Sequence, residues 1–322
     1  MAEIRFNPLT GDWVMIASHR QNRPQMPKDW CPFCPGSGKV PSEYDVYCYD
    51  NDFPALSATP PSIDDVTSDF FKAMPSYGKC EVVLYSPKHT ATLPDLTDEH
   101  LFKLTKLWQE RFNILSQDEK VKYVFIFENR GEAVGVTMPH PHGQIYAYPF
   151  LPKKLQLEEN NSKEYMDKTG SCLYCDMLKN ETQDGRRIIY KNEFFTVFLP
   201  FFCEYPYGVY IMSNVHKQHI GQFNEKELFS LGVTIKQTAG MLDSLFGYTF
   251  PYMMCMHNAP VNSGSDEENF HFHIEFFPPM RSAEKIKFNA SSETGAWAHC
   301  NPTAPEEKAE ELRVAYRKYM SR

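Results

Sequence analysis

The chain has 322 residues and a mass of 37.4 kDa, which suits two domains or one duplicated unit at about 100–200 residues per domain. Its composition, 42% hydrophobic, 14% aromatic and 23% charged, excludes disordered, collagen-like and coiled-coil proteins. The net charge of −8 excludes a general nucleic-acid binder, which would carry an excess of basic residues.

The sequence also indicates where the protein works. The N-terminal residues lack the apolar core of a secretory signal. The most apolar stretch, residues 194–212, is interrupted by Pro200, Glu204, Pro206 and Gly208, so it does not predict a membrane span. We therefore expect a soluble, cytoplasmic protein.

The predicted elements recur in the same order in two halves of the chain. In the first half we expect a Cys-x-x-Cys pair, then strand 81–85, helix 98–117, strand 123–127 and a closing His-Pro-His-Gly-Gln motif. In the second half, 141 positions later (172 minus 31), come a second Cys-x-x-Cys pair, strands 195–199 and 208–212, helix 225–246, strand 252–256 and a His-Phe-His-Ile-Glu motif. This order predicts an α+β (or α/β) fold in which one antiparallel-sheet-plus-helix unit is used twice.

The polar run 158–170 has the composition of a linker between the two repeats. We therefore place the repeats at residues 1–157 and 158–322, and we expect a C-terminal helix that begins near Pro305.

Each repeat carries two cysteines and two histidines in the same order. The two sets are Cys31, Cys34, His89, His140 and Cys172, Cys175, His216, His271. Two thiolates and two imidazoles are the ligands of a closed, structural zinc site, so we expect one zinc ion in each repeat. The alternative is a reduced thiol pair packed into a core without metal. The other five cysteines (Cys48, Cys80, Cys203, Cys255 and Cys300) are interpreted as small buried hydrophobic residues.

The motif that closes the first repeat predicts the chemistry. Residues two apart in a strand share a face, so His140, His142 and Gln144 project together. A zinc-bound His140 would fix the strand, and His142 would act as a nucleophile towards a phosphate ester if a backbone carbonyl held its other ring nitrogen. In the second repeat Glu275 stands where the first has Gln144. A carboxylate would repel a phosphate, so we assign catalysis to the first repeat.

These residues resemble the galactose-1-phosphate uridylyltransferase family of the histidine-triad (HIT) superfamily, in its branch with two zinc knuckles. The matching motifs are Phe127-Glu-Asn-Arg-Gly before His140-Pro-His-Gly-Gln, together with Arg20-Gln-Asn-Arg-Pro, Asn51-Asp-Phe, Ser86-Pro-Lys-His and Phe276-Phe-Pro-Pro. The resemblance implies a duplicated HIT-like fold and a ping-pong exchange. His142 would take UMP from UDP-glucose, release glucose 1-phosphate and pass UMP to galactose 1-phosphate, which gives UDP-galactose.

The resemblance also implies the binding residues. For the nucleotide these are Arg20, Arg23, Asn51, Asp52, Asn129 and Thr137. Gln144 would hold the phosphoryl oxygens without acting as an acid or base, while Lys287 and Glu293 would contact the hexose phosphate. Family members imply a homodimer in which the partner subunit completes the sugar site.

Two departures leave alternatives open. Some family members bind iron through one glutamate and three histidines; Glu158, His257 and His273 match the first three, but Glu275 replaces the last histidine. Iron at this set is the alternative to zinc at the second Cys₂His₂ set. Ser292 also replaces a tyrosine that contacts the sugar phosphate. The rival functions are a nucleotidyltransferase or phosphorylase that uses ADP-glucose or another sugar nucleotide, and a zinc-stabilised nucleotide-binding protein without turnover.

Overall fold

The computed structural model describes residues 2–22, 30–264 and 267–322. The strands are β1 (Ala2–Asn7), β2 (Asp12–Ala17), β3 (Tyr47–Asp50), β4 (Ala73–Pro75), β5 (Lys79–Leu84), β6 (Tyr123–Arg130), β7 (His142–Tyr148), β8 (Ile188–Lys191), β9 (Phe195–Phe198), β10 (Tyr210–Ser213), β11 (Tyr252–His257) and β12 (His273–Phe277). The α-helices are α1 (Asp98–Ser116), α2 (Lys153–Thr169), α3 (Leu173–Asp184), α4 (Glu225–Phe246), α5 (Ser291–Ala296) and α6 (Pro305–Met320).

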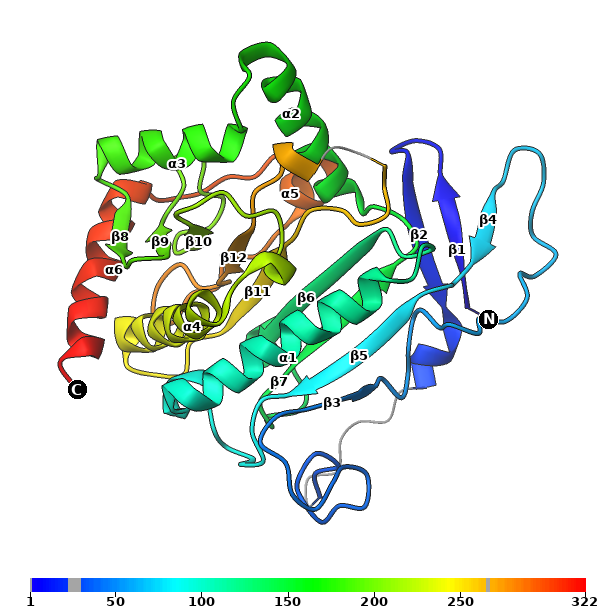
Figure 1. The fold of residues 1–322 in the computed structure, drawn as a ribbon, viewed down its shortest axis with the longest axis horizontal. Helices are drawn as coiled ribbons and strands as arrows, with labels where there is room; N and C mark the ends of the chain where they lie inside the picture. Colours follow the sequence, from blue (N-terminus) through cyan, green and yellow to red (C-terminus); the bar gives the residue numbers. More distant parts are fainter. Residues whose placement is uncertain (1, 23–29, 265–266) are drawn as a thin grey trace.

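One antiparallel sheet of nine strands runs through both halves of the chain. Its order is β3-β5-β7-β6-β11-β12-β10-β9-β8, and β6 of the first repeat pairs directly with β11 of the second. A separate three-stranded sheet, β2-β1-β4, also belongs to the first repeat and lies beside that repeat's part of the large sheet (Figure 1). The expected α+β fold, built from a duplicated sheet-plus-helix unit, is confirmed.

The two faces of the large sheet have different roles. Residues paired across antiparallel strands point to the same face. The register pairs Gln144 with Phe127, Phe127 with Cys255, and Cys255 with Glu275. These four residues form one row on what we call the site face, and Gln144 and Glu275 lie about 14 Å apart along it, three strand spacings of about 4.8 Å. The opposite face is the helix face.

Helices α1 and α4 lie side by side on the helix face, and α6 packs against α4 (Figure 1). Both long helices begin where a side chain accepts hydrogen bonds from the first turn: Thr97 for α1, and Asn224 in a capping box with Glu227 for α4. Their buried residues form the main core together with the sheet. Arg130 of β6 joins Asp243 of α4 through two hydrogen bonds of 2.9 and 2.8 Å, which fixes the sheet against the helix.

The expected linker at 158–170 is wrong, because residues 153–169 form helix α2. Its polar side chains face solvent while Leu155 and Ser162 are buried, and Gly170 ends it in the left-handed conformation. The polar composition therefore reflects an exposed helix and not an irregular connection.

Two further expectations can be compared with the structure. Cys80 and Cys203 are buried and Cys48 and Cys255 partly so, but Cys300 is exposed, so the expectation that it is buried is wrong. Among the described residues, none of the helices has the length and apolar character needed to cross a membrane.

Candidate active site and metal centres

The first set of cysteines and histidines converges on one point. The Sγ atoms of Cys31 and Cys34 lie 3.7 Å from Nδ1 of His140, and Sγ of Cys34 lies 3.6 Å from Nδ1 of His89. Cys31 and Cys34 lie in a loop, His89 follows the end of β5, and His140 precedes the start of β7. Their four side chains could hold a metal ion.

The second set repeats this geometry. Sγ of Cys175 lies 3.4 Å from Nδ1 of both His216 and His271, and Cys172 completes the group. Cys172 and Cys175 come from the start of α3, and His271 directly precedes β12.

Equivalent backbone carbonyls orient the buried histidine of each set. Nε2 of His140 lies 2.8 Å from the carbonyl oxygen of Ser86, and Nε2 of His271 lies 3.0 Å from that of Ser213. Because a carbonyl only accepts, Nε2 carries the proton and the Nδ1 lone pair faces the thiols. Burial lowers the pKa of His140 to about 4, which keeps its ring neutral near pH 7.

The same argument fixes the tautomer of His142. Its Nδ1 lies 2.7 Å from the carbonyl oxygen of His140, so Nδ1 donates and Nε2 bears the lone pair. This is the acceptor that the sequence argument required. The His140 side chain belongs to the first metal-type cluster while its backbone orients His142, so one residue joins the two sites.

Gln144 is held with its amide nitrogen directed away from its protein partners. Its Oε1 accepts from Asn51 Nδ2 at 3.4 Å and from the Tyr146 hydroxyl at 3.3 Å, which leaves the –NH₂ group as a donor for a ligand. The Tyr146 hydroxyl also lies 3.5 Å from Nη1 of Arg20. Sequence reasoning missed Tyr146, although it lies two residues after Gln144 on the same face of β7.

The side chain of Tyr85 leaves no space for a Cβ atom at residue 143, so glycine is required there. On the helix face, a Cβ atom at residue 143 would overlap the hydroxyl of Tyr85 and lie 2.9 Å from the carbonyl oxygen of Phe127. Tyr85 also binds the segment directly, because its N–H donates to the carbonyl of Pro141 at 3.0 Å. Tyr85 therefore supports the backbone on both sides of His142, a role that sequence reasoning missed.

A cleft of about 250 Å³ opens beside His142. Asn129 and Thr137 line it, as do Tyr85 and the buried carboxyl of Glu128, whose pKa is raised to about 7 by burial. Arg20, from the 3-10 helix Ser18–Asn22, and Asn51, directly after β3, form a separate hydrogen-bonded group with Gln144 and Tyr146 of β7.

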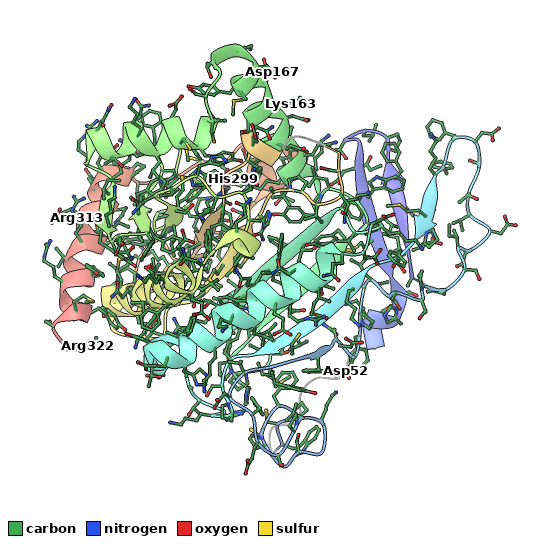
Figure 2. All side chains as sticks on the ribbon, viewed as in Figure 1. Asp52, Lys163, Asp167, His299, Arg313 and Arg322 are labelled. Atoms are coloured by element: carbon green, nitrogen blue, oxygen red, sulfur yellow. The ribbon has the colours of Figure 1, made fainter. Side chains whose placement is uncertain are left out.

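The other predicted binding residues lie elsewhere. Asp52 forms an ion pair with Lys39 near the end of β3 (Figure 2). Lys287 and Glu293 form an ion pair with each other at 3.2 Å, and neither is among the residues that line the cleft beside His142. Arg23 lies outside the described residues.

A third group of metal-type donors exists alongside the second Cys₂His₂ set. Its members are Glu158, His257, His273 and Glu275, which we call the carboxylate cluster. From the sequence, iron at this set is the alternative to zinc at the second Cys₂His₂ set. The structure forms both, because His271 turns towards the cysteines before β12 begins whereas His273 lies on the site face of β12.

The second repeat has the same hydrogen-bond geometry as the His-x-His motif of the first repeat, but its second histidine is not accessible to a substrate. Nδ1 of His273 lies 2.9 Å from the carbonyl oxygen of His271, as in the first repeat. However, His273 is 1% exposed, and the rings of Tyr174 and Tyr210 lie 5.2 and 5.8 Å from it. A substrate phosphate cannot reach this ring, which agrees with the assignment of catalysis to the first repeat.

The contact between Gly143 and Tyr85 generates a prediction. Gly143→Ala should destabilise the protein by about 1–3 kcal/mol, the usual cost of overpacking, and the double variant with Tyr85→Phe should regain part of the loss. Urea denaturation measures both. Gly295→Ala is the matched control, because an added Cβ there meets nothing within 4 Å. Equal midpoints for Gly143→Ala and the control would contradict the account.

Comparison with known proteins agrees with this geometry. Residues 1–152 match the sequence model for the N-terminal domain of galactose-1-phosphate uridyl transferase, and residues 158–314 match that for its C-terminal domain. Among similar sequences, the galactose-1-phosphate uridylyltransferase of Thermotoga maritima is 40% identical over 97% of this chain and 98% of its own length. That of Haemophilus influenzae is 33% identical over 96% of this chain and 93% of its own length.

Solved structures are similar over the whole chain. A uridylyltransferase structure superimposes with a TM-score of 0.91 at 30% identity and covers 98% of this chain and 99% of its own. An ADP-glucose phosphorylase from Arabidopsis thaliana, with bound ADP-glucose, has a TM-score of 0.75 at 22% identity, covers 97% of this chain and 99% of its own, and so shares the fold. The motif around His142, the duplicated fold and these matches together establish that the chain belongs to the galactose-1-phosphate uridylyltransferase family.

Proposed function

We propose that the protein is a UDP-glucose–hexose-1-phosphate uridylyltransferase that moves UMP from UDP-glucose to galactose 1-phosphate, in galactose metabolism. The observation that carries the proposal is the oriented pair of His142 and Gln144. His142 presents an Nε2 lone pair, and Gln144 presents an amide donor two residues away on the same face.

In the first half-reaction, Nε2 of His142 attacks the α-phosphorus of UDP-glucose. The new P–N bond forms as the P–O bond to glucose 1-phosphate breaks, and glucose 1-phosphate leaves with the bonding electrons. The ring becomes positively charged, and its Nδ1–H stays on nitrogen and donates to the carbonyl of His140. In the second half-reaction, a phosphate oxygen of galactose 1-phosphate attacks the same phosphorus and the P–N bond breaks.

Gln144 suits transfer to a sugar phosphate better than hydrolysis. Its amide group can donate to the phosphoryl oxygens as charge develops on them, but it cannot remove a proton from water. The incoming phosphate is already an anion and needs no general base. We infer that Arg20 and Asn51, which share the hydrogen-bonded group with Gln144, and Asn129 and Thr137, which line the cleft, contact the nucleotide together with Asp52 and Arg23.

We propose zinc as the ion of both Cys₂His₂ clusters. A tetrahedral ion with Zn–S of about 2.3 Å and Zn–N of about 2.0–2.1 Å holds sulfur and nitrogen about 3.6 Å apart. The observed Sγ–Nδ1 distances of 3.4–3.7 Å fit this value. Four protein ligands leave no position for water, so both ions would be structural. All nine cysteines are free of disulfides, which suits a protein of the reducing cytoplasm.

We further propose a homodimer of two-repeat subunits, with the repeats at 1–157 and 158–322. The two family models match almost the same halves. Lys287 and Glu293 would then contact a substrate in the cleft of the other subunit. The dimer would also cover Phe288 and Trp297, which are 74% and 57% exposed in the isolated chain.

Light scattering tests the dimer. The measured mass should be twice 37.4 kDa, and a mass of 37.4 kDa would refute the dimer.

Replacing the nucleophile tests the proposed reaction. His142→Ala should lower the rate of glucose 1-phosphate release from UDP-glucose by at least about 10⁴-fold, because no other group can form the P–N bond. His299→Ala, at an exposed position beside α5 (Figure 2), should keep the wild-type rate. Substantial turnover by His142→Ala would show that another residue is the nucleophile, and turnover with ADP-glucose alone would change the assigned donor.

Replacing a cluster cysteine tests the metal assignment. Cys31→Ser should lower the zinc content from two ions to one per chain and lower the melting temperature, because the remaining ligands no longer close the site. Elemental analysis and calorimetry measure the two effects. Cys300→Ser, an exposed cysteine outside the clusters, is the control and should change neither. An unchanged zinc content in Cys31→Ser would refute the first site.

A further inference from the structure

The carboxylate cluster departs from the iron site that the family resemblance implies. Glu275 replaces the last histidine, so the set has two imidazoles and two carboxylates. The cluster lies on the site face between β11, β12 and α2, and Glu275 is only 2% exposed. A buried carboxylate needs a compensating positive charge or several hydrogen bonds.

The hydrogen bonds of the two histidines show where that charge is needed. Nδ1 of His273 donates to the carbonyl of His271 at 2.9 Å, and Nδ1 of His257 donates to Glu158 Oε2 at 2.8 Å. In the neutral rings both Nε2 atoms therefore carry lone pairs. They lie 3.4 Å (His257) and 3.6 Å (His273) from the oxygens of Glu275, so acceptors face acceptors. A cation placed among them would relieve this repulsion.

The chain itself supplies a cation at this place. Nζ of Lys154 lies 2.5 Å from Glu275 Oε2 and 3.9 Å from Glu158 Oε1, and it lies over the ring of Phe277 at 4.8 Å. Lys154 precedes Glu158 by four residues in α2, which brings both side chains to the same side of the helix. The remaining oxygen of Glu275 accepts from the Tyr210 hydroxyl at 2.5 Å.

We propose that the Lys154 ammonium is the resident cation of the carboxylate cluster and that it excludes a metal ion there. The chain then carries two metal ions, in the Cys₂His₂ clusters, and not three. This inference does not depend on the proposed transfer reaction, but its expected ion counts rest on the proposed zinc in both Cys₂His₂ clusters.

The contacts explain why lysine and metal compete. A divalent ion bound by Glu158 and Glu275 would lie against the ammonium, which already engages both carboxylates, and like charges so close repel strongly. The side chain of Lys154 is half exposed, so the cluster would remain open to an ion from solvent if the ammonium were removed. The donor set without Lys154 suits zinc or iron(II).

The test is the number of metal ions bound per chain. Full-length wild-type protein, Lys154→Met and Lys153→Met are dialysed against zinc, and separately against iron(II) without oxygen, then freed of excess metal and measured by elemental analysis. Lys153 is the matched control, because it is the adjacent lysine of α2 and donates to Gln156 instead. We expect two ions per chain in the wild type and Lys153→Met, and three in Lys154→Met.

Two more variants assign the extra ion. Lys154→Met/His273→Ala should return to two ions, because it removes a ligand of the carboxylate cluster, and Lys154→Arg should stay at two, because it keeps the charge. Three ions in the wild type, or two in a folded Lys154→Met protein under both dialysis conditions, would overturn the proposal. If Lys154→Met does not fold, Lys154→Gln, which also removes the charge, takes its place with the same expected count of three, and a count of two would overturn the proposal.

Discussion

The geometry of the active site depends on the two ends of one residue, His140. Its imidazole belongs to the first Cys₂His₂ cluster and is oriented by the carbonyl of Ser86, while its own carbonyl accepts the Nδ1 proton of His142. The tautomer of the nucleophile is thereby set by a backbone atom whose position the cluster fixes. Tyr85 supports the same segment from the helix face, through Pro141 and the space left by Gly143. A metal ion held by this cluster would thus influence the position of His142, the proposed nucleophile, without touching the substrate.

The second repeat has the same hydrogen-bonded framework, but its histidine is buried. His271 and His273 repeat the hydrogen bonds of His140 and His142, including the carbonyl that orients each metal-type ligand. What differs is access to the second histidine of the motif: in the first repeat a cleft reaches His142, whereas in the second α2 and two tyrosine rings bury His273. Duplication supplied two copies of the geometry, and in the proposed mechanism the burial of one copy restricts the reaction to the other.

The sequence predicted the elements whose pattern is local or repeated. The long helices and central strands were predicted within a few residues because apolar periodicity is strong in a chain with a large core. The grouping of each Cys₂His₂ set was predicted because all four residues recur in order. The pairing of β6 with β11 was not predictable, since no local pattern specifies which strands meet at the junction of two repeats.

The features that the sequence did not predict have physical reasons. The 158–170 run has the composition of a linker because only a narrow line of α2 is buried and most of its residues are exposed or partly exposed. Tyr85 and Tyr146 carried no signal, because tyrosines are common in and beside strands and because Pro141, Gly143 and Arg20, which they contact, are distant in sequence. Lys154 was missed for the same reason: its partner, Glu275, is 121 residues away in sequence and is reached only when α2 lies on the sheet.

The measurement that tests the central claim most directly is the intact mass of the protein after mixing with UDP-glucose alone. The account predicts a gain of one uridine monophosphate group, lost again when galactose 1-phosphate is added and absent in His142→Ala. No adduct with UDP-glucose, or an adduct that persists in His142→Ala, would contradict the assignment of His142 as the oriented nucleophile.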